Sequence, residues 1–331
     1  MPGPNVRRRL VVFGGLCTLA FAVVARAQET ARLQRPVRIA VLTSSWGPPP
    51  VVGPFTRHLI ELGYAEGTDF FIATWFTEGD NPALYQRARE IVAAGVDIIV
   101  PVGAVETDAV RLAAPDHPIV FMYIGDPVAQ GQVRSYAHPG GNMTGVAELG
   151  DAVAGKRLQL FAELVPAMRR VVLPFDRNDP YEAAQAGKYR AAAARLGIGF
   201  AATPLATADD AIAYVGGITR DDWGGILSPS DVGLNIPGLV IEATRTRGVP
   251  SMFDGPNYVD VGGLAAYGPP VEDQGRRGAD IVDQIIRGIS PAEIPVQAVT
   301  RQEFVINLAT AAVLGMTIDP VILFKADRLF R

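Results

Sequence analysis

The stretch NPALYQRAREIVAAGVDIIVPV, residues 81–102, contains one helix and the strand that follows it. Asn81 and Pro82 are typical of an N-cap and a first helical residue, and Gly95 is typical of a helix end. The run from Val96 to Val102 is apolar enough to be a strand buried on both faces, as strands of parallel sheets are. The stretch therefore predicts the helix-then-strand unit from which α/β folds are built.

The same unit repeats on both sides of residues 81–102. Strands alternate with helices along the chain, which predicts an α/β protein with two mostly parallel sheets, each flanked by helices. The predicted strands are 37–42, 69–74, 96–102, 119–124, 170–175, 198–202, 223–227, 249–253, 264–267 and 304–307. The predicted helices are 54–62, 81–94, 106–114, 155–165, 181–196, 208–215, 236–246 and 271–287, with helical pieces after residue 307.

Composition excludes several classes of protein. The 331 residues are 49% hydrophobic with a net charge of −4, which is too apolar and too weakly charged for a disordered chain. A single cysteine cannot form a disulfide within the chain. The balance of 30 basic against 34 acidic residues argues against a nucleic-acid partner, and no apolar run is long enough to span a membrane. The length instead predicts two globular domains.

The N-terminus has the pattern of a secretory signal peptide, residues 1–27. Three arginines at 7–9 precede an apolar stretch from Leu10 to Val24, and Ala25-Arg26-Ala27 provides the cleavage site. The alternative is a buried first helix, and export by the Sec or the twin-arginine route stays open. A lipid anchor at Cys17 is not expected, because Leu16 is too bulky before it. Cleavage would leave a periplasmic protein that we expect to be a monomer.

Sites for catalysis or metal binding are not evident. The three histidines, His58, His117 and His138, lie apart, and without cysteine after residue 27 they do not make a zinc or Cys–His site. Residues 28–331 contain no G-x-S-x-G, H-E-x-x-H or P-loop pattern, and no G-x-G-x-x-G follows the first strand. An Asp/Glu pair of the glycosidase type stays open, although no pair stands out. We therefore expect neither a catalytic residue nor a metal nor a cofactor.

The loops that follow the predicted strands are the candidate ligand site, because open α/β sheets bind ligands at the carboxyl ends of their strands. Serine hydroxyls and helix N-termini suit a carboxylate, so Ser44 and Ser45 are its expected partners. Asp126 or Asp231 would accept from an amine, and Trp46 would cover an apolar side chain. The alternative for each polar residue is a helix cap or a turn. The candidate ligand-binding residues of these loops are Ser44, Ser45, Trp46, Gly103, Ala104, Val105, Asp126, Pro127, Asp176, Asn178, Ser230 and Asp231.

Several stretches resemble a known family. They are LGYAEG at 62–67, GDPV at 125–128, PGGNMTG at 139–145, GKRLQL at 155–160, YGP at 267–269 and FVINL at 304–308. The chain is similar in these stretches to ABC-transporter substrate-binding proteins of the tryptophan/tyrosine type, which have the type I periplasmic-binding-protein fold. The resemblance implies two lobes joined by three crossings: residues 37–146 with 267–297, and residues 147–266 with 298–331. It also implies a membrane permease of an ABC importer as partner, and it adds Tyr267 to the candidate ligand-binding residues.

The chain departs from the family pattern in the expected pocket. Val102-Gly103-Ala104 stands where relatives often have Gly-Gly-Thr, and the loop after residue 175 reads Asp-Arg-Asn-Asp-Pro. The ligand is therefore expected to be a small carboxylate-bearing molecule, an amino acid or a related compound, without assuming an aromatic one. Two other functions stay open, a periplasmic sensor that does not serve transport and, less in keeping with the residues, a secreted hydrolase.

Overall fold

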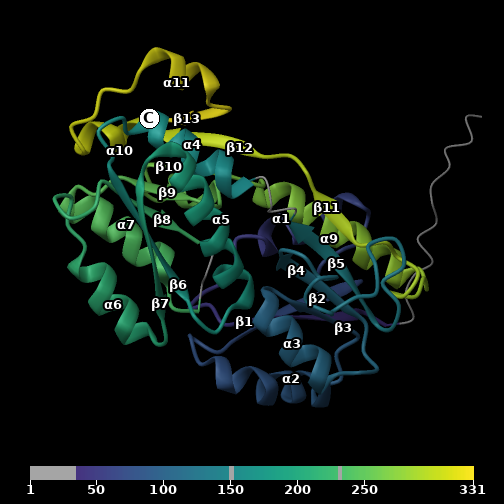
Figure 1. The fold of residues 1–331 in the computed structure, drawn as a ribbon. Coiled ribbons are helices and arrows are strands. Elements are labelled where there is room, and N and C mark those ends of the chain that lie inside the picture. Colours follow the sequence, from purple (N-terminus) through teal and green to yellow (C-terminus); the bar gives the residue numbers. More distant parts are fainter. Residues whose placement is uncertain (1–34, 149–152, 230–232) are drawn as a thin grey trace, which may run out of the picture. The chain divides into compact units, whose positions relative to one another are not determined.

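A computed structural model describes residues 35–148, 153–229 and 233–331 (Figure 1). The predicted signal peptide, residues 1–27, and the candidate residues Ser230 and Asp231 lie outside these ranges. None of the described helices is long and apolar enough to cross a membrane.

The first sheet has six parallel strands in the order β11-β5-β4-β3-β1-β2. The strands are β1 (Val37–Thr43), β2 (Phe70–Phe76), β3 (Ile98–Pro101), β4 (Ile119–Ile124), β5 (Met143–Glu148) and β11 (Gln297–Val299). Residues on β1 alternate between the two faces of this sheet. Ile39 and Val41 pack under α1 (Val52–Glu61) and α9 (Val271–Ile286), while Ala40 and Leu42 pack under α2 (Leu84–Ala93) and α3 (Ala104–Ala113).

The second sheet has seven strands in the order β13-β12-β10-β9-β8-β6-β7, and only the β10–β12 pair is antiparallel. The strands are β6 (Arg170–Asp176), β7 (Gly199–Leu205), β8 (Gly225–Ser228), β9 (Ser251–Phe253), β10 (Ala265–Gly268), β12 (Glu303–Asn307) and β13 (Arg328–Phe330). One face packs against α4 (Val153–Leu164) and α5 (Pro180–Leu196), and the other against α6 (Ala208–Gly217) and α7 (Ile236–Arg247). The prediction of two mostly parallel sheets flanked by helices is confirmed.

The two sheets share one strand order. In each, the first five strands along the chain lie in the order second, first, third, fourth, fifth, and late strands extend the sheet beyond the fifth. The shortest helices, α8 (Asn257–Asp260), α10 (Leu308–Val313) and α11 (Pro320–Lys325), all belong to the chain around the second sheet. In both sheets the strand order changes direction between the first and the third strand. Open α/β sheets bind ligands outside the carboxyl ends of the strands at such a point.

Several elements differ from the sequence prediction. Arg328–Phe330 is a strand paired with β12, where helical pieces were predicted. Met143–Glu148 is a strand of the first sheet, and the chain leaves that sheet only after it. Asp80, not Asn81, caps the turn that starts the second helical segment, through its side chain and the Ala83 N–H of the 3₁₀ turn η1 (Asn81–Ala83). The three strands that were not predicted, β5, β11 and β13, are short, and each is established by its pairing with another strand.

The chain passes between the sheets after β5, between β10 and α9, and between β11 and β12 (Figure 1). The sequence-based boundary at residue 267 falls inside β10, which pairs with β9 and β12 of the second sheet. Helix α9 then packs against α1, β4 and β5 of the first. The division into two lobes at these crossings remains our proposal.

Candidate functional site

A cavity of about 120 Å³ lies between loops of the two sheets. At about 10–15 Å³ for each water molecule, it has room for several waters or for one small organic solute. Its lining follows the strand ends. From the first sheet come Ser44 after β1, Gly103 after β3, Tyr123 in β4 and Glu148 at the end of β5; from the second come Asp176 at the end of β6, Pro229 after β8, Asp254 after β9 and Pro269 after β10.

Glu106, in the first turn of α3, forms the first wall of the cavity. Its Oε1 accepts hydrogen bonds from the Ser44 backbone N–H at 2.8 Å and from the Ser44 hydroxyl at 2.6 Å. Gly103 leaves room for this carboxyl, because a Cβ there would lie 2.2 Å from Glu106 Oε2 and the φ of +122° also favours glycine. Burial raises the pKa of Glu106 to about 7. The donors of Ser44 are therefore already occupied by a carboxyl group of the chain itself.

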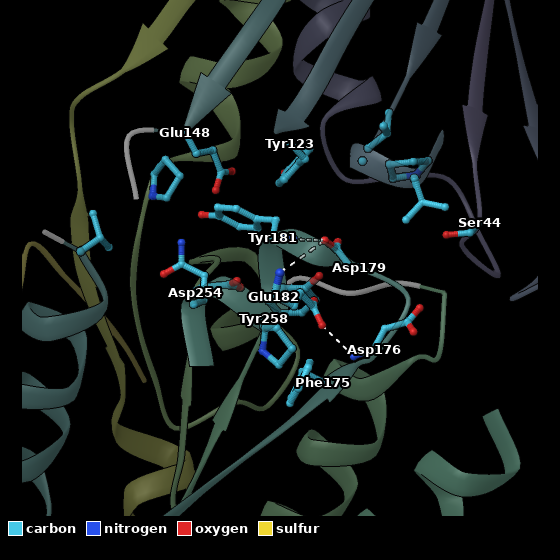
Figure 2. Close-up of a pocket in the computed structure, with 18 of the residues that line it drawn as sticks. Ser44, Tyr123, Glu148, Phe175, Asp176, Asp179, Tyr181, Glu182, Asp254 and Tyr258 are labelled. Atoms are coloured by element: carbon cyan, nitrogen blue, oxygen red, sulfur yellow. Dashed lines mark hydrogen bonds between the residues drawn. The ribbon is translucent and has the colours of Figure 1, made fainter. Parts of the chain in front are cut away.

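The N-terminus of α5 forms the second wall (Figure 2). Asp179 is its N-cap, and its Oδ1 accepts from the N–H groups of Tyr181 at 2.7 Å and Glu182 at 3.3 Å. Glu182 in turn accepts from the Asp176 N–H at 2.8 Å. Burial raises the pKa of both Asp176 and Asp179. The second helix N-terminus at the cavity is thus also occupied by a carboxylate of the chain.

A third group of charges joins the ends of β5 and β9. The Gln274 amide of α9 donates to Glu148 at 2.6 Å. Burial, together with the nearby carboxylate of Asp254, raises the pKa of Glu148 to about 7. Arg157 of α4 is buried, and it donates to the Tyr267 carbonyl at 2.7 Å and to the Tyr189 hydroxyl. Both of these hydrogen-bond partners are neutral, and the nearby carboxylate of Asp254 attracts the positive charge of Arg157.

Aromatic rings line the space between these charged groups. Tyr123 has a φ of +57°, at an irregularity in the pairing of β4 with β5 that lies between Phe121 and Ile124. A bulge of this kind re-aims a side chain, and Tyr123 lines the cavity while it also packs against the core of the first sheet. Tyr181 of α5 and Tyr258 of α8 lie below it in Figure 2, with Tyr181 beside Glu148. Burial raises the pKa of Tyr123 and Tyr181 well above 10, so both phenols are neutral.

Loops of the two sheets touch each other around the cavity. The Asn81 amide donates to Asp176 Oδ2 at 3.2 Å, and Trp46 Nε1 donates to the Gly233 carbonyl at 3.3 Å. The Tyr181 ring lies against Gly125, where a Cβ would come within 1.8 Å of a ring carbon. Gly125 belongs to the loop after β4 and Tyr181 to α5, so the contact joins the two sheets. The structure therefore has its strand-end loops closed over the cavity.

Four residues predicted for the site line the cavity, namely Ser44, Gly103, Val105 and Asp176. Two neighbours of theirs do not. Ser45 donates to the Gly47 carbonyl at 2.6 Å and so shapes its own loop. Asn178 donates two hydrogen bonds to Asp176, one from its backbone N–H at 2.8 Å and one from its side-chain amide at 3.0 Å. Ala104 and Pro127 are buried without being among the lining residues.

Three further predicted residues also lie outside the lining. Asp126 is exposed, and its carboxylate accepts from the N–H groups of the turn that follows it, at 3.1 and 3.0 Å. The turn role, which was the alternative, is what the structure shows. Trp46 is 57% exposed and covers the loop of Gly233. Tyr267 contributes its carbonyl to Arg157, while its ring packs on the core of the second sheet. Ser230 and Asp231 lie outside the described residues.

Sequence reasoning missed most of the charged lining. Asp254 directly follows a predicted strand, so the strand-end rule could have found it. Glu148 ends a strand that was not predicted, and Glu106 lies in the first turn of a helix, where the helix dipole favours acidic residues whether or not they bind a ligand. The missed lining residues with ionisable side chains are Glu106, Tyr123, Glu148, Arg157, Asp179, Tyr181, Glu182, Tyr189, Asp254 and Tyr258.

Comparison with known proteins agrees with this architecture. A curated tyrosine-binding protein of Clostridioides difficile is 22% identical over 277 residues, 82% of this chain and 79% of that protein. A conserved domain protein from Vibrio cholerae has a similar structure, with a TM-score of 0.79 and 23% identity over 89% of this chain and 100% of the other. An ABC domain from Streptococcus pneumoniae in complex with L-Trp has a TM-score of 0.76 and 22% identity over the same shares.

A family described as ABC transporter substrate binding protein matches residues 37–329. The match spans both sheets and every wall of the cavity, and it confirms the resemblance found in the sequence. This chain belongs to the family of ABC transporter substrate-binding proteins.

Proposed function

We propose that the protein is the exported receptor of an ABC importer, and that it captures a small amine-bearing solute, an amino acid or a compound related to one. The observation that carries the proposal is the cavity enclosed between the strand-end loops of two sheets. A site of this kind reaches a ligand from both sides, so the ligand favours the closed arrangement through contacts that the open one lacks. Release to a membrane permease would then require the lobes to part again.

The class of ligand is supported by the relatives and by the lining. One relative is named a tyrosine-binding protein, and another structure holds L-Trp. In this chain the cavity combines carboxylates, which accept from an ammonium group, with tyrosine rings and apolar side chains that fit a carbon skeleton. The apolar members are Val102, Val105, Val153, Leu173 and Phe175. Closure buries the charged part of the ligand, so the lining must supply its hydrogen bonds.

We propose a location outside the cytoplasm, in the periplasm, because residues 1–27 have the pattern of a signal peptide and the family serves transport. We propose no catalytic role for the carboxylates. Glu106, Asp179 and Glu182 each accept hydrogen bonds from the chain's own backbone, which suits holding a ligand in place.

Calorimetric titration of ligand-stripped protein with a panel of amino acids and their related amines tests the proposal. We expect saturable binding with one ligand per chain, and recovery of the ligand unchanged by mass spectrometry. Absence of binding to every member of the panel would overturn the proposal. Consumption of a bound compound during long incubation would favour the hydrolase alternative instead.

A further inference from the structure

We propose that the ligand is an amino acid whose free carboxylate binds the guanidinium of Arg157, while its ammonium group faces carboxyl groups of the lining. The inference rests on the proposed function and deepens it, because it names the class of ligand and the residue that selects this class. It revises the expectation from the sequence that Ser44 and Ser45 bind the carboxylate.

The two serines predicted for this role use their donors within the chain. The Ser44 N–H and hydroxyl both donate to Glu106. The Ser45 N–H donates to Thr43 Oγ1 at 3.1 Å, and its hydroxyl donates to the Gly47 carbonyl at 2.6 Å. A ligand carboxylate that bound either serine would have to break one of these hydrogen bonds, which costs free energy. The carboxylate therefore needs another donor in the cavity.

Arg157 has such donors to offer. A guanidinium has five N–H groups in a rigid fork and keeps its charge inside a protein. The Arg157 Nε donates to the Tyr267 carbonyl and Nη1 donates to the Tyr189 hydroxyl, so these hydrogen bonds fix the orientation of the fork. Its other N–H groups, including both on Nη2, donate to no described residue. They belong to a side chain that lines the cavity, and a fork of this kind matches the two oxygens of a carboxylate.

The buried charge of Arg157 also favours an anionic partner. The residue is only 8% exposed, and arginines in such positions are rarely buried without a paired charge. Asp254 attracts the guanidinium, but it forms no hydrogen bond with it. A carboxylate that binds the fork directly gains more, because the attraction between charges grows as their distance falls and as water is excluded.

A second unused donor lies on the same wall of the cavity. Gln185 lines the cavity, and its Nε2 is buried without a hydrogen-bond partner. Gln185 and Tyr189 are four residues apart on α5, so their side chains share one face of the helix. Since Tyr189 holds Arg157, the Gln185 amide and the guanidinium serve the same side of the cavity. A carboxylate accepts from both groups, whereas an ammonium group accepts from neither.

Glu148 supplies an opposite charge from the first sheet. Its Oε1 accepts from Gln274, and its Oε2 accepts from no described residue. Burial raises the pKa of Glu148, and the positive charge of Arg157 opposes this rise, so the two charges act on each other. They form no hydrogen bond with each other, and both have unused atoms at the same cavity. An amino acid carries an ammonium group and a carboxylate on one carbon, so it can bind both residues at once.

Three forms of one ligand, which differ only in the carboxyl group, test the inference on the unaltered protein. Ligand-stripped protein is titrated with each amino acid of the panel beside its amide and its amine, as in L-tyrosine, L-tyrosinamide and tyramine. We expect the tightest binder to be a free amino acid, at least tenfold tighter than its amide and its amine. An amide or amine that binds as tightly overturns the inference and leaves the proposed function intact. Absence of binding to every compound contradicts the proposed function itself.

The variant Arg157→Gln removes the charge and the fork. We expect the ratio of amino-acid affinity to amine affinity to fall at least tenfold, whereas a purely structural role would weaken both forms alike and leave the ratio unchanged. Arg195→Gln, at an exposed position of α5, is the control and should keep the ratio. An unchanged ratio in Arg157→Gln overturns the inference. If thermal melting shows that Arg157→Gln does not fold, Arg157→Lys, which keeps the charge without the fork, should lower the ratio at least threefold.

The variant Glu148→Gln should have the opposite pattern. It removes a negative charge that faces the ammonium group, which the amino acid and the amine share, so both should bind more weakly. The ratio of the two affinities should not fall, because losing a negative charge near Arg157 does not weaken its contact with a carboxylate. A fall in the ratio as large as that of Arg157→Gln would contradict the assignment of the carboxylate to Arg157.

Discussion

The two helix N-termini that face the cavity make a useful comparison. Helix α3 follows the third strand of its sheet and α5 follows the first strand of the other, and each meets a carboxylate at its start. At α5 this carboxylate is Asp179, an ordinary N-cap. At α3 the N-cap is Gly103, which has no side chain, and the carboxylate comes from Glu106 inside the first turn. It reaches out of the helix to Ser44, in the loop after β1.

The difference separates stability from function. Asp179 satisfies backbone donors of its own helix, as such a cap does in any protein. Glu106 instead links two loops of the first sheet, is fully buried, and has a pKa near 7. A carboxyl group in that state changes its charge readily when a ligand arrives. We therefore expect the α5 wall to act as scaffold and the α3 wall to respond to the ligand.

The largest expected effect comes from Gly125→Ala. The added Cβ would lie 1.8 Å from the Tyr181 ring, so the two walls could not come together. Gly125 does not have a positive φ, so the open protein accommodates alanine without strain. We expect calorimetry to show at least a hundredfold loss of affinity with an unchanged melting temperature of the ligand-free protein. Gly187→Ala, with no atom within 4 Å of the new Cβ, is the control and should bind normally.

Paired changes at the two helix starts sharpen the comparison itself. Asp179→Ala should lower the free energy of unfolding by about 1 kcal/mol, the usual cost of a lost N-cap. Glu106→Gln keeps an oxygen for Ser44 and removes the charge, so it should weaken amine binding about tenfold without lowering stability. Urea denaturation and calorimetry on both variants measure the two effects. The distinction between the walls would be wrong if Asp179→Ala left stability unchanged and Glu106→Gln reduced it.

The pH should move the ligand-free protein between its closed and open forms. Glu106 and Glu148 have a pKa of about 7 when buried, above the ordinary 4.5 expected once the walls part and water reaches them. The closed form therefore holds protons more tightly, so closure is favoured at low pH and disfavoured as the pH rises from about 4.5 through 7. Small-angle scattering should show a larger radius of gyration at pH 8 than at pH 5. The opposite trend would contradict these pKa values.

The smallest expected effect comes from Trp46→Phe. The substitution removes the 3.3 Å hydrogen bond to the Gly233 carbonyl, which joins the two sheets at a position where Trp46 is 57% exposed. A hydrogen bond open to water contributes about 0.5–1 kcal/mol at most, so the affinity should fall two- to fivefold. Trp223→Phe, before β8 and outside the lining, should leave the affinity unchanged. An effect as large as that of Gly125→Ala would mean that Trp46 holds the walls closed.

Local sequence signals predicted most of the fold. Proline, glycine and capping residues at 81–95 and 179–197 indicate helices, and the apolar runs between the predicted helices are strands in the structure. The strand-end rule located Ser44, Gly103 and Asp176 at the cavity. The helices and strands could be predicted because caps and alternating hydrophobicity act over a few residues, whereas a role of these three residues in ligand binding stays a prediction.

The charged lining could not be predicted in the same way. Tyr123 reaches the cavity only because β4 pairs irregularly with β5, and Glu148 ends a strand that distant pairing creates. Asp126 follows a strand, as the ligand-binding residues of such sheets do. Its carboxylate nevertheless accepts hydrogen bonds from the backbone N–H groups of the turn that comes after it. The effect of Asp254 on Glu148 exists only when the two sheets are brought together, and neither local stretch contains that information.

The most direct test is the identity of the molecule that the protein carries. Protein purified under native conditions is denatured, and the released compound is identified by mass spectrometry and quantified against the chain. The account predicts one small amine-bearing solute per chain, an amino acid or a compound related to one. Recovery of a carboxylic acid without an amine, or of a neutral sugar, at that ratio would contradict it.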